Sequence, residues 1–173
     1  MLQSKSSDDK YGTADLRAIA WAVLKQAIRW RFPQVAHLSA AELAQRLQTD
    51  SPILLLDTRT ASEFAVSHLK DARHAPTVQA AMQQAPAPDF SIVTYCSIGY
   101  RSSRLAQQLQ RQGYSSVYNL EGSIFDWMNQ GYPVFQAGQI THVVHPYSPL
   151  WQGLLQPSIL ATTEPAPPLS PSG

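Results

Sequence analysis

The chain has 173 residues, of which 14% are charged and 44% are hydrophobic, and its length allows one compact domain with additional segments. Its formal net charge is only +1, and no basic block is interleaved with aromatic residues, which argues against nucleic-acid binding. The single cysteine, Cys96, excludes an internal disulfide and a zinc site made only of thiolates.

The N-terminal region divides into two parts. Residues 1–12 are polar and lack the basic and then apolar layout of a secretory signal, so we expect a disordered segment and a cytoplasmic protein. Residues 13–35 hold a predicted helix, which Pro33 terminates. Apolar residues recur in it at helical spacing, at Leu16, Ile19, Ala20, Val23, Ala27 and Trp30.

Two interpretations of this N-terminal helix follow from its residues. Four basic side chains interrupt it, so it is not expected to span a membrane, which takes about 20 mostly apolar residues. We expect the apolar stripe to pack against the domain. The alternative is a helix lying at a membrane surface, because Trp21 and Trp30 stand among arginine and lysine.

From residue 36 to 134 the pattern alternates between strands and helices. A continuous apolar run over 53–56 predicts a strand that is buried on both faces, the pattern over 91–95 predicts a second buried strand, and that over 117–120 predicts a third strand. Capping boxes at Ser39 and Thr60 predict two helices, and further helices are predicted over 101–112 and around Trp127. The alternation predicts an α/β fold, a small doubly wound parallel sheet with helices on both faces.

The C-terminal part has two segments with different composition. Residues 135–160 are apolar and aromatic without a clear period, and we expect an extension that packs on the domain. Residues 161–173 are rich in proline, serine and threonine, which predicts a disordered tail. His142 and His145 do not suggest a metal site, since no acidic residue or cysteine lies between 135 and 160.

Cys96 follows a predicted buried strand and precedes a predicted helix. Ligands bind at this end of the strands in open α/β sheets. Gly99 allows a tight loop whose backbone N–H groups converge, the following helix adds its positive end, and Arg101 adds a fixed charge. All three features favour a thiolate and an anion or persulfide bound beside it. The predicted site comprises Cys96 as nucleophile and the binding residues Ser97, Ile98, Gly99, Tyr100, Arg101 and Ser102.

The length of this loop distinguishes two kinds of cysteine chemistry. Tyrosine-phosphatase-like loops place five residues between the cysteine and the arginine, whereas four separate Cys96 from Arg101. A smaller ring of N–H groups suits one sulfur atom better than a tetrahedral phosphate. A phosphatase or an arsenate reductase is therefore the weaker alternative, and the lone cysteine also argues against arsenate reduction resolved by an internal thiol.

Four motifs in order resemble those of a single-domain rhodanese, a sulfurtransferase, over residues 36–134. They are Asp57-Thr58-Arg59 with Glu63-Phe64, then His68-Leu69 with Ala72, Ala75 and Pro76, then Cys96 to Ser102, and finally Leu120-Glu121-Gly122 with Trp127, Gly131 and Pro133. Departures occur where Ser67, Asp71 and Ser123 replace glycines, where Lys70 replaces a proline, and at His74. They lie outside the active loop, so we expect them to affect local turns and not the chemistry.

The resemblance implies a two-step cycle. Cys96 takes a sulfane sulfur from thiosulfate or a similar donor as a persulfide and passes it to cyanide, a thiol or a protein acceptor, without a cofactor or metal. Arg101 would hold the anionic end of the donor, while Asp57 and Arg59 are expected to brace the sheet near the loop. The main alternative is a rhodanese-like module that binds a partner and acts as a sulfur carrier or sensor without turnover.

Overall fold

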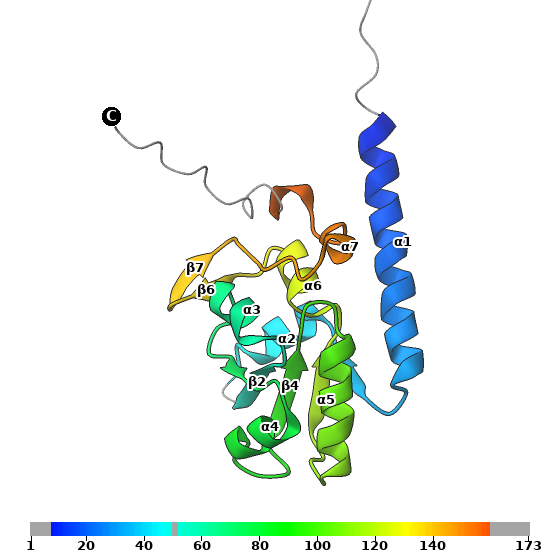
Figure 1. The fold of residues 1–173 in the computed structure, drawn as a ribbon. Helices are drawn as coiled ribbons and strands as arrows, with labels where there is room; N and C mark the ends of the chain where they lie inside the picture. The colour runs from blue at the N-terminus through cyan, green and yellow to red at the C-terminus, as the bar shows by residue number, and fades with distance from the viewer. Residues whose placement is uncertain (1–7, 50–51, 160–173) are drawn as a thin grey trace, which may run out of the picture.

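A five-stranded parallel sheet forms the centre of the computed structural model, which describes residues 8–49 and 52–159 (Figure 1). The strand order is β1-β5-β4-β2-β3, with every neighbouring pair parallel. The strands are β1 (Ala36–Leu38), β2 (Ile53–Asp57), β3 (Arg73–His74), β4 (Ser91–Tyr95) and β5 (Val117–Leu120). The central strand, β4, therefore delivers Cys96 to the middle of the carboxyl edge of the sheet.

Two hydrophobic cores cover the two faces of this sheet. Leu54 and Leu56 of β2 contribute to the core that holds α4 (Val78–Gln84) and α5 (Tyr100–Arg111). Leu55, between them, contributes to the core that holds α2 (Ala40–Arg46) and α6 (Ser123–Asn129). Because strand side chains alternate between faces, this division confirms the predicted parallel sheet with helices on both sides. The remaining crossover helix is α3 (Ala61–Val66).

The N-terminal helix, α1 (Asp8–Arg31), stands beside the domain (Figure 1). The helix begins at Asp8, so the prediction that residues 1–12 are disordered is wrong for residues 8–12. Residues 1–7 lie outside the described part. The predicted contact face is also wrong. The side chains of the predicted stripe are exposed, with Leu16 at 68%, Ile19 at 59%, Val23 at 64% and Trp30 at 82%.

A second apolar stripe on α1 packs against the domain instead. Trp21 and Ile28 are buried in the two different cores, so the helix ties one face of the sheet to the other. Polar contacts select this face: Lys25 pairs with Asp126 at 2.8 Å, and Arg29 pairs with Glu121 at 2.6 Å. Periodicity alone could not choose between two apolar stripes on one helix.

The two tryptophans of α1 provide a matched test of this packing. Trp21 is 8% exposed and donates its indole N–H to the Leu154 carbonyl at 3.1 Å. We expect Trp21→Ala to lower the free energy of unfolding by about 3 kcal/mol, because it leaves a cavity in the core; the Leu154 carbonyl keeps its hydrogen bond from the Asn129 side chain at 2.8 Å. Trp30→Ala should change it by about 0.5 kcal/mol or less. Urea unfolding followed by circular dichroism measures both, and equal losses would contradict the assigned face.

The segment after the sheet forms a hairpin and a short helix. The antiparallel strands β6 (Val134–Gln136) and β7 (Gln139–Thr141) make the hairpin, which joins the domain through a β-bridge between His68 and Phe135. The helix α7 (Pro149–Gln152) follows, and Val144, Leu154 and Leu155 are buried in the core beneath α6. The predicted tail, residues 161–173, lies outside the described part.

None of the helices in the described ranges combines the length and the apolar character that crossing a bilayer requires.

Candidate active site

The loop after β4 is shaped by Gly99 and by α6. Gly99 is the N-cap of α5 with φ 111°, a conformation that favours glycine, and its N–H donates to the Cys96 Sγ at 3.1 Å. The carbonyls of Cys96 and Ser97 accept from Ile124 and Phe125 at the start of α6, each at 3.2 Å. The N–H of a trans peptide points opposite to its C=O. The N–H groups of Ser97 and Ile98, which share peptides with these two carbonyls, therefore point away from α6.

The Cys96 sulfur is buried among hydrogen-bond donors. Its residue is 1% exposed, and the hydroxyls of Ser102 and Ser123 lie 3.5 Å and 3.9 Å from the Sγ. Burial raises the pKa of the thiol, but the Ser102 hydroxyl, the charge of Arg101 and the Gly99 N–H outweigh it and lower the pKa below its ordinary value. The site therefore favours the thiolate, as the loop sequence predicts.

A hydrogen-bonded chain leads from β1 to this sulfur. The Asn119 side chain contacts the Nδ1 of His37 at 3.1 Å and the hydroxyl of Ser102 at 2.6 Å. A hydroxyl carries one proton, so Ser102 donates either to the amide oxygen of Asn119 or to the sulfur of Cys96. Burial also lowers the pKa of His37, which favours its neutral form. Asn119 and His37 were not predicted as site residues, because no local motif connects them to Cys96.

Arg101 is bound by Glu63, a residue predicted only as part of a capping box and a family motif. Two nitrogens of the guanidinium donate to the two Glu63 oxygens at 2.7 Å and 2.9 Å, and one also donates to the Ser97 hydroxyl at 3.0 Å. Burial raises the pKa of Glu63, but the hydrogen bonds from Arg101 and Thr60 prevail and lower it to about 2. Glu63 thus fixes the arginine beside the loop and neutralises most of its charge.

Ser123 corrects one expectation from the sequence. Its replacement of a family glycine was expected to affect only a turn, yet its hydroxyl accepts the Cys96 N–H at 3.0 Å and lies 3.9 Å from the sulfur. The residue adopts a positive φ of 53°, where glycine is usual. The departure therefore adds a hydroxyl to the cysteine environment, which a glycine could not supply.

A small pocket of about 150 Å³ opens at Cys96. Two of its walls come from the C-terminal extension, since Tyr147 and Trp151 line it together with Ile98, Tyr100 and Arg101 of the loop. The Tyr147 ring lies 4.6 Å from the guanidinium carbon of Arg101. The loop sequence did not indicate these two aromatic walls, because they lie about 50 residues after Cys96.

Asp57 and Arg59 lie at the end of β2 and are both fully buried. The Arg59 guanidinium donates to both carboxylate oxygens of Asp57, with a shortest distance of 2.6 Å, and to the Ser67 carbonyl at 2.5 Å. The pair therefore ties the end of β2 to the turn after α3. This arrangement suits the bracing role predicted from the sequence.

Histidines and acidic residues do not gather into a group of three or more that could hold a metal within residues 8–49 and 52–159. His68 is engaged structurally: its ring stacks on Phe64 with centroids 4.3 Å apart, and its Nδ1 contacts the Leu69 carbonyl oxygen at 2.9 Å. These contacts give His68 a structural role in the turn after α3.

Ser102 should be required for the lowered pKa of Cys96. We expect Ser102→Ala to raise that pKa, so alkylation of Cys96 by iodoacetamide would need a higher pH than in the wild type, because only the thiolate reacts. Since the chain has one cysteine, the rate of mass gain reports on Cys96 alone. Ser103→Ala is the control: its hydroxyl donates to the Gly99 carbonyl at 2.7 Å and not to sulfur. Identical pH profiles for S102A and wild type would contradict the assignment.

Comparisons with known proteins agree on one family. Residues 39–130 match the rhodanese-like domain. A sulfurtransferase from Allochromatium vinosum is 35% identical over 101 residues, covering 58% of this chain and 94% of that protein. A tRNA uridine(34) hydroxylase from Onion yellows phytoplasma is 32% identical over 99 residues, but the match covers only 32% of it and 53% of this chain.

Solved structures show the same fold. A thiosulfate sulfurtransferase from Pseudomonas aeruginosa superposes with a TM-score of 0.59 at 20% identity, covering 71% of this chain and 24% of that one. The family match covers more than half of the chain, and it includes both Cys96 and Glu63. The chain therefore belongs to the rhodanese-like domain family.

Proposed function

We propose that the chain is a sulfurtransferase that takes a sulfane sulfur from thiosulfate, or a donor of similar size, and carries it as a Cys96 persulfide to an external acceptor. Family membership and the related sulfurtransferase support sulfur transfer in general. The observation that carries the proposal is the thiol itself, which is buried, has a lowered pKa and receives the Gly99 N–H at 3.1 Å.

In the first step the Cys96 thiolate attacks the outer sulfur of thiosulfate. A bond forms between the Cys96 Sγ and that sulfur, the S–S bond of thiosulfate breaks, and sulfite leaves with the bonding electron pair. The loop N–H groups that point away from α6 can then donate to the terminal sulfur of the persulfide, while the hydroxyls of Ser102 and Ser123 stay beside the Cys96 Sγ. The partner carboxylate of Glu63 keeps Arg101 in place for the anionic donor.

In the second step an acceptor removes the terminal sulfur and restores the thiolate. No other cysteine exists in the chain to resolve the persulfide, so the acceptor is external. The pocket of about 150 Å³ and the 1% exposure of Cys96 favour a small acceptor, such as cyanide or a low-molecular-weight thiol, over a folded protein. We place this reaction in the cytoplasm, following the sequence prediction.

Intact mass spectrometry tests the proposal directly. Incubation with thiosulfate is expected to add the mass of one sulfur atom to the protein, and cyanide should then remove it with release of thiocyanate. Cys96→Ser should gain no mass and release no thiocyanate. Full thiocyanate production by C96S would overturn the mechanism.

The same experiment separates the alternatives. A persulfide that forms but is not discharged by any small acceptor would favour the carrier or sensor module. Hydrolysis of a phosphate ester that depends on Cys96 would favour a phosphatase.

A further inference from the structure

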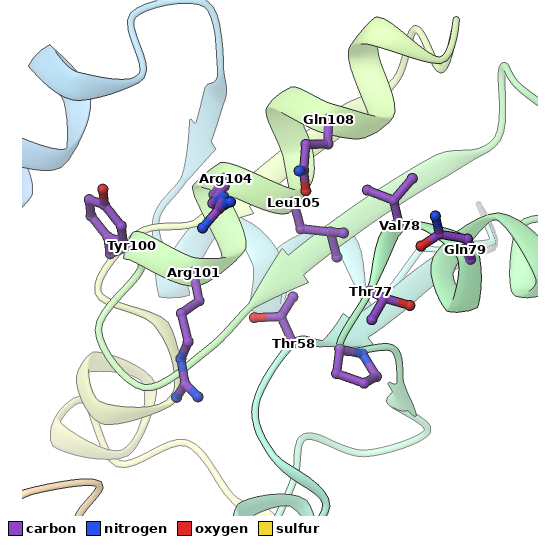
Figure 2. Close-up of a pocket in the computed structure, with 10 residues that line it drawn as sticks. Thr58, Thr77, Val78, Gln79, Tyr100, Arg101, Arg104, Leu105 and Gln108 are labelled. Carbon is purple, nitrogen blue, oxygen red and sulfur yellow. The ribbon is translucent and has the colours of Figure 1, made fainter.

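A second and larger hollow lies beside the sulfur pocket, between α5 and the start of α4 (Figure 2). Its volume is about 390 Å³, and its polar lining includes Thr58, Thr77, Gln79, Arg101, Arg104 and Gln108. No aspartate or glutamate is among the described side chains that line it. We call this hollow the α4–α5 cleft.

Two groups of the α4–α5 cleft lack partners within the described residues. Thr58 is 7% exposed, and its Oγ1 has no hydrogen-bond partner there, so a bound ligand that supplies one would remove the cost of leaving this hydroxyl unpaired. Arg104 is exposed and makes no ion pair or hydrogen bond with another described residue. Figure 2 shows Thr58 below the first turns of α5, which carry Arg101 and Arg104.

Of the two arginines that line the α4–α5 cleft, only Arg104 has an uncompensated charge. Arg101 is bound to Glu63 at 2.7 Å, so most of its charge is neutralised. Arg104, one turn later on α5, supplies a guanidinium that is free to bind a ligand. A guanidinium binds a carboxylate through two parallel hydrogen bonds, and the buried Thr58 hydroxyl, which lines the same cleft, can bind another oxygen of the ligand. The lining therefore suits a small molecule that carries a carboxylate.

The cleft is connected to the sulfur site. Tyr100 and Arg101 line both the α4–α5 cleft and the Cys96 pocket, so a molecule that extends past these two side chains reaches from one to the other. Thiosulfate and cyanide fit within the smaller pocket and have no part that could occupy the cleft. The additional volume indicates an organic substrate with a tail.

We propose that the α4–α5 cleft binds the carboxylate end of a low-molecular-weight thiol, the acceptor in the second step, with Arg104 and Thr58 as its specificity-determining residues. This proposal rests on the proposed sulfurtransferase function. The acceptor thiol loses its proton to solvent, and its thiolate attacks the terminal sulfur of the Cys96 persulfide. A new S–S bond forms on the acceptor, the old one breaks, and its electron pair returns to Cys96 as the thiolate.

Steady-state kinetics with thiosulfate as donor and three acceptors test this proposal. Mercaptosuccinate carries two carboxylates, thioglycerol is a neutral thiol of similar size, and cyanide has no tail. We expect Arg104→Gln to raise the KM for mercaptosuccinate by about 5- to 10-fold, with less than about a 2-fold change for thioglycerol and cyanide. Thr58→Val, which keeps the side-chain shape, should raise the same KM by about 3-fold.

Arg111→Gln is the matched control, because Arg111 is another exposed arginine of α5 at its far end. Equal effects of R104Q on all three acceptors, an equal effect of R111Q, or no effect on mercaptosuccinate would each overturn the proposal. Slower loading of Cys96 by thiosulfate in R104Q, measured as mass gain, would also overturn it by assigning the cleft to the donor. Absence of thiocyanate formation by the wild type would instead refute the proposed function itself.

Discussion

Replacing Glu63 by glutamine is expected to lower the free energy of unfolding by about 2–3 kcal/mol and to slow persulfide formation at least about tenfold. The substitution removes the charge of a carboxylate that is 3% exposed and leaves the Arg101 guanidinium, which is 30% exposed, without its partner. It also weakens the contact of Ser97 with Glu63, so the loop that carries Cys96 loses one of its supports.

The loss of stability should depend on pH in a defined direction. The pKa of Glu63 is lowered from an ordinary value of 4.5 to about 2 in the folded protein. A carboxyl with a lowered pKa stabilises the fold fully above its unfolded pKa and loses this contribution as the pH falls through the folded pKa. The difference between wild type and E63Q should therefore be constant above about pH 5 and shrink between pH 4.5 and 2.

Glu42→Gln provides the control for this experiment. Glu42 and Glu63 both occupy the third position of a helix with a capping box, but Glu42 is exposed and its box belongs to α2. E42Q should therefore report the loss of a capping contact alone, with a smaller loss of stability than E63Q and without an effect on Cys96. Chemical denaturation across pH and mass-spectrometric loading by thiosulfate measure both outcomes. Similar results for the two variants would refute the role given to the Arg101–Glu63 pair.

The second large effect is expected at Gly122, immediately before α6. A Cβ at this position would lie 2.4 Å from the Cβ of Asp126, and the backbone has a positive φ of 69°. Asp126 is itself held by Lys25 at 2.8 Å and cannot move without shifting α6. We expect Gly122→Ala to cost about 3 kcal/mol, from steric overlap and backbone strain together.

This substitution should also reduce activity, because the start of α6 holds the carbonyls of Cys96 and Ser97. Gly113→Ala isolates the backbone contribution: Gly113 has φ 92°, but an added Cβ would meet no atom within 4 Å. G113A should cost about 1 kcal/mol and leave persulfide formation unchanged. Thermal unfolding and the rate of sulfur loading compare the two variants, and equal losses would show that steric overlap at Gly122 is unimportant.

Local sequence signals predicted the central features well. The strands predicted over 53–56 and 91–95 form as β2 and β4, and the capping boxes at Ser39 and Thr60 have the expected hydrogen bonds. The reactive loop is similarly local, since Cys96 and Gly99 belong to one short turn. In each case the interactions that decide the structure lie within a few residues along the chain.

The features that were missed depend on distant partners or on weak turn signals. Arg101 and Glu63 are 38 residues apart, and nothing in either local pattern indicates their pairing. The β6–β7 hairpin turns at Ala137 and Gly138, both with positive φ, where asparagine or aspartate before glycine is the usual signal. The face of α1 that holds Trp21 packs on the domain because Lys25 and Arg29 form ion pairs with residues about 100 positions away in the chain.

The Trp21–Leu154 contact has a consequence for how this protein can diversify. It anchors the segment whose Tyr147 and Trp151 form walls of the sulfur pocket, and both partners lie outside the family-matched residues 39–130. The loop that carries Cys96 thus lies within the family-matched residues, whereas two walls of its pocket lie after them. Substitutions at the entrance can change which molecules reach Cys96, while the loop that carries it stays unaltered.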